Sequence, residues 1–282
     1  MEDFFILIQI IILLATMIVS GLTFYWSHMF SKKSKIQSDS NKLFELEKER
    51  LKLQAQIIEL TQKINYRQSA RDDVNDQNEQ NLMLSAKLRE CTQMLSGIQL
   101  EMKHILDAVG NCYNDFTLLQ CRLFAECWDK FQNFYKARFF WEHAISMDES
   151  NSAIKSETLR YYGLFLFNNG FKDAGNKQFY KSVEFNDDND CDRYINASTY
   201  YAWIQAYYTY LINYPQNAET LSVCMKEIGD IIKKYKIVIK SIRHKGKRTQ
   251  ALEDLEKING IINSLDQIAI QYNIQPINGG CI

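Results

Sequence analysis

The side chains that could bind a metal or transfer a proton are scattered along this sequence. The histidines are His28, His104, His143 and His244. Two histidines that bind one metal from a single helix stand about four residues apart, and no two of these have that spacing. The sequence therefore predicts no histidine metal site, and we expect His143 to be a surface residue.

The densest acidic cluster, Asp187 to Asp192, suggests a calcium-binding loop. A helix–loop–helix calcium loop needs a glycine at its sharp turn and a glutamate at its end, and this cluster has neither. We expect a solvent-exposed turn between helices instead. The sequence also has no glycine-rich phosphate loop and no Gly-x-Ser-x-Gly motif. It therefore predicts no catalytic residue, no metal and no cofactor, and hence a protein that is not an enzyme.

Cysteine usage gives a hint about the environment of the chain, which has seven cysteines. They are Cys91, Cys112, Cys121, Cys127, Cys191, Cys224 and Cys281. A disulfide framework usually has an even, clustered set, and a structural zinc site has close pairs of ligands. Isolated cysteines in odd number favour reduced, mostly buried thiols, as in a cytoplasmic domain.

Composition points to helices. The 282 residues contain 33 basic and 34 acidic side chains, so no strong positive field attracts nucleic acid, and we expect no nucleic-acid partner. Prolines occur only at Pro215 and Pro276, and there are 11 glycines. Long tracts without a helix breaker predict an all-α chain.

Residues 4–24 carry no charge and are long enough to span a bilayer as a helix. Aromatic residues and lysines follow this stretch, whereas Glu2 and Asp3 precede it. A signal peptide would start with positive charge and have a shorter apolar core, so we favour a retained anchor over a cleaved one. Because positive charge stays on the cytoplasmic side, we expect the N-terminus outside and the C-terminal bulk in the cytoplasm. We assign residues 1–30 to a transmembrane anchor.

Two heptad seams follow in residues 31–110. The first consists of Leu43, Leu46, Leu53, Ile57, Leu60 and Ile64, interrupted by Arg50. The second consists of Leu84, Leu88, Cys91, Leu95, Ile98, Met102 and Ile105. Such narrow stripes need a partner helix and predict a coiled coil, through which the chain could form a homo-oligomer. Two geometries remain open: one continuous stalk, or a hairpin that folds back within residues 72–80. We favour the stalk, since that region has no Gly or Pro for a tight reversal.

Aromatic residues become dense after Gly110, and a pattern of about 34 residues then fits twice. The first copy contains Phe124, Ala125, Trp128, Phe134, Ala137, Trp141 and Ala144. The second contains Leu159, Tyr162, Gly163, Leu166, Gly170, Phe171, Ala174, Phe179 and Ser182. This stretch resembles the tetratricopeptide repeat, in which small residues let paired helices approach. The second copy departs from the family by one residue missing before Ala174 and one gained before Phe179. A third copy, starting near Tyr200, lacks the small-residue positions.

The resemblance implies a helical repeat domain over residues 111–245 and a capping helix and tail over 246–282. In the family, the first helix of each repeat lines a concave groove that binds peptides. Carried onto this sequence, that groove would include Arg122 and Lys130 of the first copy and Arg160, Phe167 and Asn168 of the second. Basic and amide groups of this kind could hold an acidic segment or a terminal carboxylate.

A basic run from Lys233 to Arg248 has two interpretations. It could contact anionic lipid headgroups, or it could place cations at the C-terminal end of a helix, where the helix dipole favours them. We favour the second, with Gly246 ending that helix.

The order of anchor, coiled coil and helical repeat predicts a membrane-anchored scaffold or adaptor that binds a protein or peptide. The alternative is a self-associating structural component of a membrane-bound envelope or secretion complex.

Overall fold

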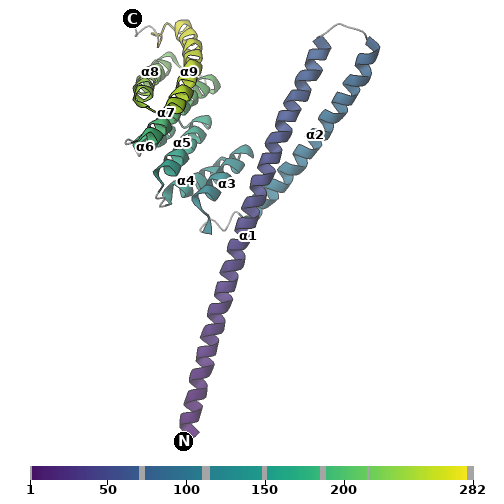
Figure 1. Ribbon diagram of the computed structural model, residues 1–282, viewed down its shortest axis with the longest axis vertical. Coiled ribbons are helices and arrows are strands. Elements are labelled where there is room, and N and C mark those ends of the chain that lie inside the picture. The colour runs from purple at the N-terminus through teal and green to yellow at the C-terminus, as the bar shows by residue number, and fades with distance from the viewer. Residues whose placement is uncertain are drawn as a thin grey trace. The chain divides into compact units, whose positions relative to one another are not determined.

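A computed structural model describes residues 2–69, 74–109, 115–147, 151–184, 189–214 and 216–277, and it does not describe the side chains of residues 2–23, 28 and 67–79. All regular elements in these ranges are helices, so the predicted all-α class is confirmed. The chain divides into two compact units, residues 1–127 and 128–282 (Figure 1). Each unit is described by itself below.

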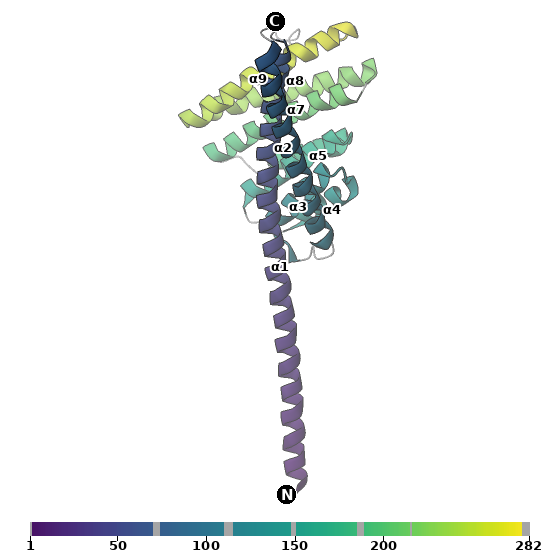
Figure 2. The same cartoon turned by 90° about the vertical axis from the view of Figure 1, so that its right-hand side faces the viewer.

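The first unit is built on two long helices, α1 (Glu2–Ser69) and α2 (Val74–Val109). α2 runs back along the C-terminal half of α1, and Lys42 Nζ lies 2.5 Å from Glu101 Oε1 (Figures 1 and 2). The favoured prediction of one continuous stalk is therefore wrong, and the hairpin is the observed geometry. Within the described side chains, no helix is long and apolar enough to cross a membrane. The predicted anchor, residues 4–24, lies outside those side chains except for Phe24, so it stays a prediction.

The two predicted seams form the interior of this hairpin. Leu43, Leu53 and Leu60 of α1 are buried, as are Cys91, Ile98 and Met102 of α2. Arg50, which interrupts the first seam, is buried as well, and its Nε and Nη2 donate to the two carboxylate oxygens of Glu47 at 2.7 and 2.9 Å. A buried guanidinium is costly unless it is paired, and this bidentate bond supplies the partner.

The second unit is a stack of antiparallel helix pairs. A helix that starts in the first unit, α3 (Leu118–Lys130), leads into α4 (Phe134–Ser146). The pairs are α5 (Ser152–Asn168) with α6 (Lys172–Glu184) and α7 (Asp190–Asn213) with α8 (Ala218–Ser241). The last helix, α9 (Lys245–Gln271), packs against α7 and α8. Consequently α5, α7 and α9 lie side by side in one layer, and α6 and α8 pack against one face of it, at the left of this unit in Figure 1.

Glycine residues let α5 and α6 approach closely. Gly163 of α5 faces α6, and an added Cβ there would lie 3.0 Å from the ring of Phe179. The facing small residue is Gly175, one position after the predicted Ala174, and an added Cβ there would clash with the ring of Phe167. The predicted pairing of small residues is thus present, but its register on α6 is shifted by one residue.

The connections between helices follow from local chemistry. Gly170 has φ +84 and closes α5, with the amide of Phe171 donating to Leu166 O at 2.8 Å, as expected for a glycine helix terminus. The predicted helix end at Gly246 is wrong, because α8 already ends at Ser241 and Gly246 lies in the first turn of α9. His244 caps α9 there, its Nδ1 accepting from Lys247 N at 3.3 Å.

Candidate functional site

A groove runs over the layer formed by α5, α7 and α9. Its volume is about 510 Å³. The residues that line it, here called the α5–α7–α9 groove, are Leu164, Asn168, Tyr201, Gln205, Ala206, Tyr208, Thr209, Lys257 and Ile261. Because three alternate helices of the chain contribute, the groove depends on the stacking of the helix pairs and not on any single turn.

Helical periodicity explains which side chains reach the groove. Tyr201, Gln205 and Tyr208 are four and three residues apart, so they share one face of α7. Lys257 and Ile261 have the same relation on α9. The neighbouring side of α7 is buried and carries Trp203 and Tyr207. Ala206 lines the groove and is itself buried, so the groove-lining face of α7 borders the core.

The groove offers amides, phenols and one ammonium group. Gln205 Nε2 donates to the Tyr201 hydroxyl at 2.8 Å, which orients both side chains. Lys257 Nζ lies 3.0 Å from Asp254 Oδ1 and 5.9 Å from the Tyr201 ring centre. The hydrogen bond to Asp254 raises the pKa of Lys257. Since Asp254 balances its charge, the groove is close to neutral, with apolar contributions from Leu164, Ala206 and Ile261.

A partly buried hydrogen-bond network holds α7 in place behind the groove. The Tyr207 hydroxyl donates to Glu227 Oε2 at 2.6 Å and accepts from Asn176 Nδ2 at 2.7 Å. Asn176 Oδ1 in turn accepts from Trp203 Nε1 at 2.7 Å. Burial, followed by the bond to Glu227, raises the pKa of Tyr207, so its hydroxyl keeps its proton. This network joins α6, α7 and α8 and fixes the rotation of α7 about its axis.

The structure places the predicted binding residues of the second copy in different environments. Asn168 lines the groove. Phe167 does not: it is fully buried, with its ring centre 5.0 Å from that of Tyr207, because its side of α5 faces the core. Arg160 pairs with Glu157 at 3.5 Å and is not among the lining residues. This groove is thus nearly neutral, and a binding role for Arg160 and Phe167 stays a prediction.

The two residues from the first copy are placed on α3. Arg122 is half-buried in the first unit, and Lys130 is exposed in the second. Neither lines the groove. A binding role for this pair stays a prediction.

The other candidate ligand groups have structural partners. Asp190 Oδ2 accepts from the backbone amides of Arg243 and His244 at 3.1 and 2.6 Å, and these bonds lower its pKa. Asp187 and Asp188 lie outside the described residues. In the part of the chain that is described, no three His, Cys, Asp or Glu side chains are grouped to hold a metal ion.

The thiols match the predicted pattern where they are described. Cys91, Cys121, Cys127 and Cys224 are buried and Cys191 is exposed, all as free thiols. Burial raises the pKa of Cys121 to about 12 and that of Cys224 to about 11, which makes both unreactive as nucleophiles. Cys112 and Cys281 lie outside the described residues.

Most of the groove was missed in the sequence because the third repeat copy could not be assigned. Trp203, Ile204 and Tyr207, which follow the start of that copy near Tyr200, lie on the buried face of α7. Tyr201, Gln205 and Tyr208 lie on the face next to it, so the signal was present as a second spacing of four and three. No protein family, curated protein or solved structure matches the chain.

Proposed function

We propose that this protein is a membrane-tethered adaptor that binds an extended segment of a partner protein in the α5–α7–α9 groove. The observation that carries the proposal is the alignment of Asn168 and Gln205, on neighbouring helices, along one groove that also exposes Tyr201 and Tyr208. The tetratricopeptide-like arrangement belongs to the same proposal and is supported by the stacked antiparallel helix pairs.

The groove chemistry suits a peptide backbone. A side-chain amide both donates and accepts hydrogen bonds, so it can pair with the N–H and C=O groups of an extended chain. Tyrosine rings supply large contact areas with little loss of conformational entropy and keep a hydroxyl for a polar contact. The partner segment is therefore expected to be neutral, with apolar or aromatic side chains at the tyrosines. This replaces the acidic segment expected from the sequence.

The tether in this proposal is residues 4–24, with the helix-pair unit on the cytoplasmic side. It is supported by the uncharged run and by the lysines that follow it, Lys32, Lys33 and Lys35. A reporter fused after residue 277 should be protected from protease in intact cells. Digestion of that reporter without permeabilisation would contradict the orientation.

The binding proposal is tested by peptide selection on the full chain in lipid nanodiscs. Peptides displayed from a random library are selected on the unsubstituted chain, and their affinities are then measured against a Tyr201→Ala/Gln205→Ala variant. We expect a loss of roughly tenfold or more, as for two central interface contacts. Asn263→Ala is the matched control, since this exposed amide lies on α9 outside the groove. Equal binding to all three chains would refute the groove.

A second candidate function, self-association, is favoured by one observation on the first unit. Phe44, Leu51 and Ile58 stand seven residues apart on α1, and each is more than half exposed, at 58%, 53% and 58%. This α1 stripe is distinct from the seam buried against α2. A strict seven-residue spacing is that of a helix–helix seam, and identical tethered chains lying parallel would place stripe against stripe. Two residues of opposite charge, Glu45 and Lys48, follow Phe44 beside this stripe.

The stripe is tested by energy transfer between labelled full chains in liposomes. Replacing Phe44, Leu51 and Ile58 by serine should abolish transfer, whereas Leu100→Ser, an equally exposed leucine on α2, should not. Transfer that survives the triple replacement, or is absent from the unsubstituted chain, would count against self-association through this surface.

A further inference from the structure

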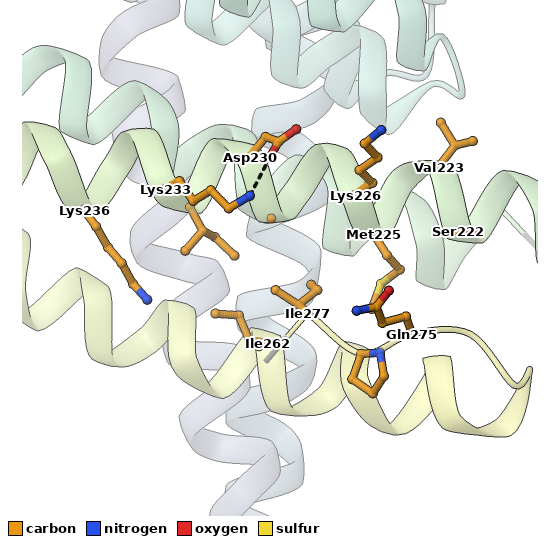
Figure 3. Close-up of a pocket in the computed structure, with 13 residues that line it drawn as sticks. Ser222, Val223, Met225, Lys226, Asp230, Lys233, Lys236, Ile262, Gln275 and Ile277 are labelled. Atoms are coloured by element: carbon orange, nitrogen blue, oxygen red, sulfur yellow. Dashed lines mark hydrogen bonds and ion pairs between the residues drawn. The ribbon is translucent and has the colours of Figure 1, made fainter. Parts of the chain in front are cut away.

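A second cavity, of about 470 Å³, lies between α8, α9 and the segment Gln275–Ile277. It shares no residue with the α5–α7–α9 groove. Figure 3 shows Ile262 and Ile277 lying between the two helices, and Lys236 extending from α8 toward α9. We call it the α8–α9 cleft. Its volume is within the range of about 300–1,000 Å³ that is usual for small-ligand sites.

One wall of the cleft is made by the chain turning back after α9. Asn273 has φ 54, and the amide of Ile274 donates to Ala269 O at 2.8 Å, which reverses the chain. The amide of Ile277 then donates to Asp266 Oδ1 at 2.6 Å. This bond fixes the segment beside α9, so the cleft is a formed feature of the unit.

The interior of the cleft is apolar. Met225 and Ile232 of α8 and Ile262 of α9 are buried side chains that also line it. Gly229 lies among them, and a Cβ added there would meet only Ile277 Cγ2, at 4.0 Å. The missing side chain of Gly229 therefore leaves open space and is not required by close packing. An apolar body of modest size would be removed from water against these residues.

The charged side chains that line the cleft are mostly positive: Lys226, Lys233, Lys236 and Asp230. Asp230 is already paired with Lys233 at 3.0 Å. In the described part of the chain, no carboxylate lies within ion-pair distance of Lys226 or Lys236. Figure 3 shows Lys236 extending toward α9, whereas Lys226 points away from it. An anion at the Lys236 end of the cleft would thus meet an ammonium group without displacing an existing partner.

We propose that the α8–α9 cleft binds a compact anionic amphiphile, meaning an apolar chain or ring system that ends in a carboxylate or phosphate group. The apolar body lies against Ile262 and Met225, and the anionic head is held by Lys236. The site does not depend on the peptide groove or on the proposed tether. A free ligand and a single lipid molecule with this chemistry would both fit it.

The test uses the full chain in phosphatidylcholine nanodiscs, labelled with ¹³C at its methionine methyl groups. The Met225 signal is assigned with a Met225→Leu variant and followed during titration with octanoate, then with the uncharged octanol, and empty nanodiscs correct for partitioning. A shift of the Met225 signal by octanoate at lower concentration than by octanol is the expected result.

Variants separate the cleft from non-specific binding. Lys236→Ala should weaken octanoate binding by roughly twofold to fivefold, as for one partly exposed charge contact. Lys240→Ala, with the same change in charge on the same helix, should not. Gly229→Leu should block the cleft, and Gly229→Ala should leave it open.

Three results would overturn the proposal. The Met225 signal could stay unchanged by octanoate, octanoate could bind Gly229→Leu as well as it binds the unsubstituted chain, or octanoate and octanol could bind equally with no effect of the lysine variants. If added phosphatidylglycerol vesicles bound through Lys236 while octanoate did not, this residue would serve a membrane surface and the cleft would bind no ligand.

Discussion

The ring of Phe167 occupies the space that a side chain at residue 175 would need. Two helices meet there, and the absence of a Cβ on Gly175 lets α6 approach α5. Phe167 in turn contacts Phe179 and Tyr207, with ring centres 5.8 and 5.0 Å away. A change at Gly175 must therefore move an aromatic core that also supports α7.

Gly175→Ala is expected to destabilise the chain by about 1–3 kcal/mol, because an inserted methyl group forces a well-packed core apart. Gly260→Ala is the matched control, since nothing lies within 4 Å of a Cβ added at that helical position. There alanine should stabilise by up to about 1 kcal/mol through its better helix propensity. Urea unfolding followed by circular dichroism measures both, and effects of the same sign would contradict this explanation.

The buried pair in the hairpin gives a second prediction. Glu47→Ala leaves the Arg50 guanidinium without its partner and is expected to cost about 3 kcal/mol. Replacing both residues by leucine should be neutral or stabilising, because no charge then has to be desolvated. Thermal unfolding of the three chains checks the order.

The exposed pair Glu59 and Lys63 serves as the control for the buried pair. Their charged atoms lie 2.5 Å apart, but both side chains are more than half exposed, at 62% and 57%. Removing this pair should change stability very little, because water screens an exposed ion pair. A loss comparable to that of Glu47→Ala would show that burial of Arg50 is not what matters.

Tyr162 gives a prediction at alkaline pH. Its hydroxyl donates to Glu142 Oε1 at 3.2 Å, and burial, with the charge of Glu142, raises the pKa of Tyr162 to about 12. An unfolded tyrosine loses its proton near pH ~10. The folded chain thus holds this proton to higher pH, so its contribution to stability is complete below pH ~10 and is lost as the pH rises toward 12.

Tyr162→Phe should therefore show a flatter fall in urea midpoint than the unsubstituted chain between about pH 10 and pH 12. Tyr135→Phe is the control, because Tyr135 is 83% exposed. Buried Tyr207 and Tyr235 have raised pKa values too, so the difference between the two variants is the informative quantity. Identical pH profiles would contradict a role for Tyr162.

Asp190 gives a prediction at acid pH. Its carboxylate accepts from the amides of Arg243 and His244, and these bonds lower its pKa. Because the pKa is lower in the folded chain, this contribution to stability is present above the ordinary value near pH ~4 and is lost as the pH falls through the folded value. Asp190→Asn should speed hydrogen exchange at residues 243 and 244 at neutral pH. Asp192→Asn, which changes the charge of a neighbour, should leave that exchange unchanged.

Local periodicity predicted the parts of the fold that depend on neighbouring residues. The seam residues Leu43, Leu53 and Ile98 are buried as their spacing indicated, because a heptad pattern defines a helix face whatever covers it. The direction of the covering helix was not encoded in that pattern. Residues 70–73, between the two helices, contain no glycine or proline, so the sequence offered no turn signal for the hairpin.

The candidate groove was only partly predictable for a related reason. Asn168 was found because the second repeat copy could be aligned, whereas Phe167, its neighbour, points to the core. Tyr201 and Gln205 belong to a helix pair that lacks the small-residue pattern, so no template assigned their face. The other lining residues depend on which helices lie side by side, and that is a property of the tertiary structure.

The hairpin of α1 and α2 also determines where the rest of the chain begins. Lys32 Nζ lies 3.0 Å from Asp115 Oδ2, and Gln120 Nε2 donates to Gln37 Oε1 at 3.1 Å. The chain between Lys32 and Asp115, about eighty residues, therefore runs up α1 and back down α2 and ends beside the part of α1 where it began. If residues 4–24 lie in a bilayer, the tip of the hairpin is the point of this unit farthest from the membrane. Adding or deleting whole heptads in both helices would then change the distance of the tip from the membrane and leave that of residue 115 unchanged.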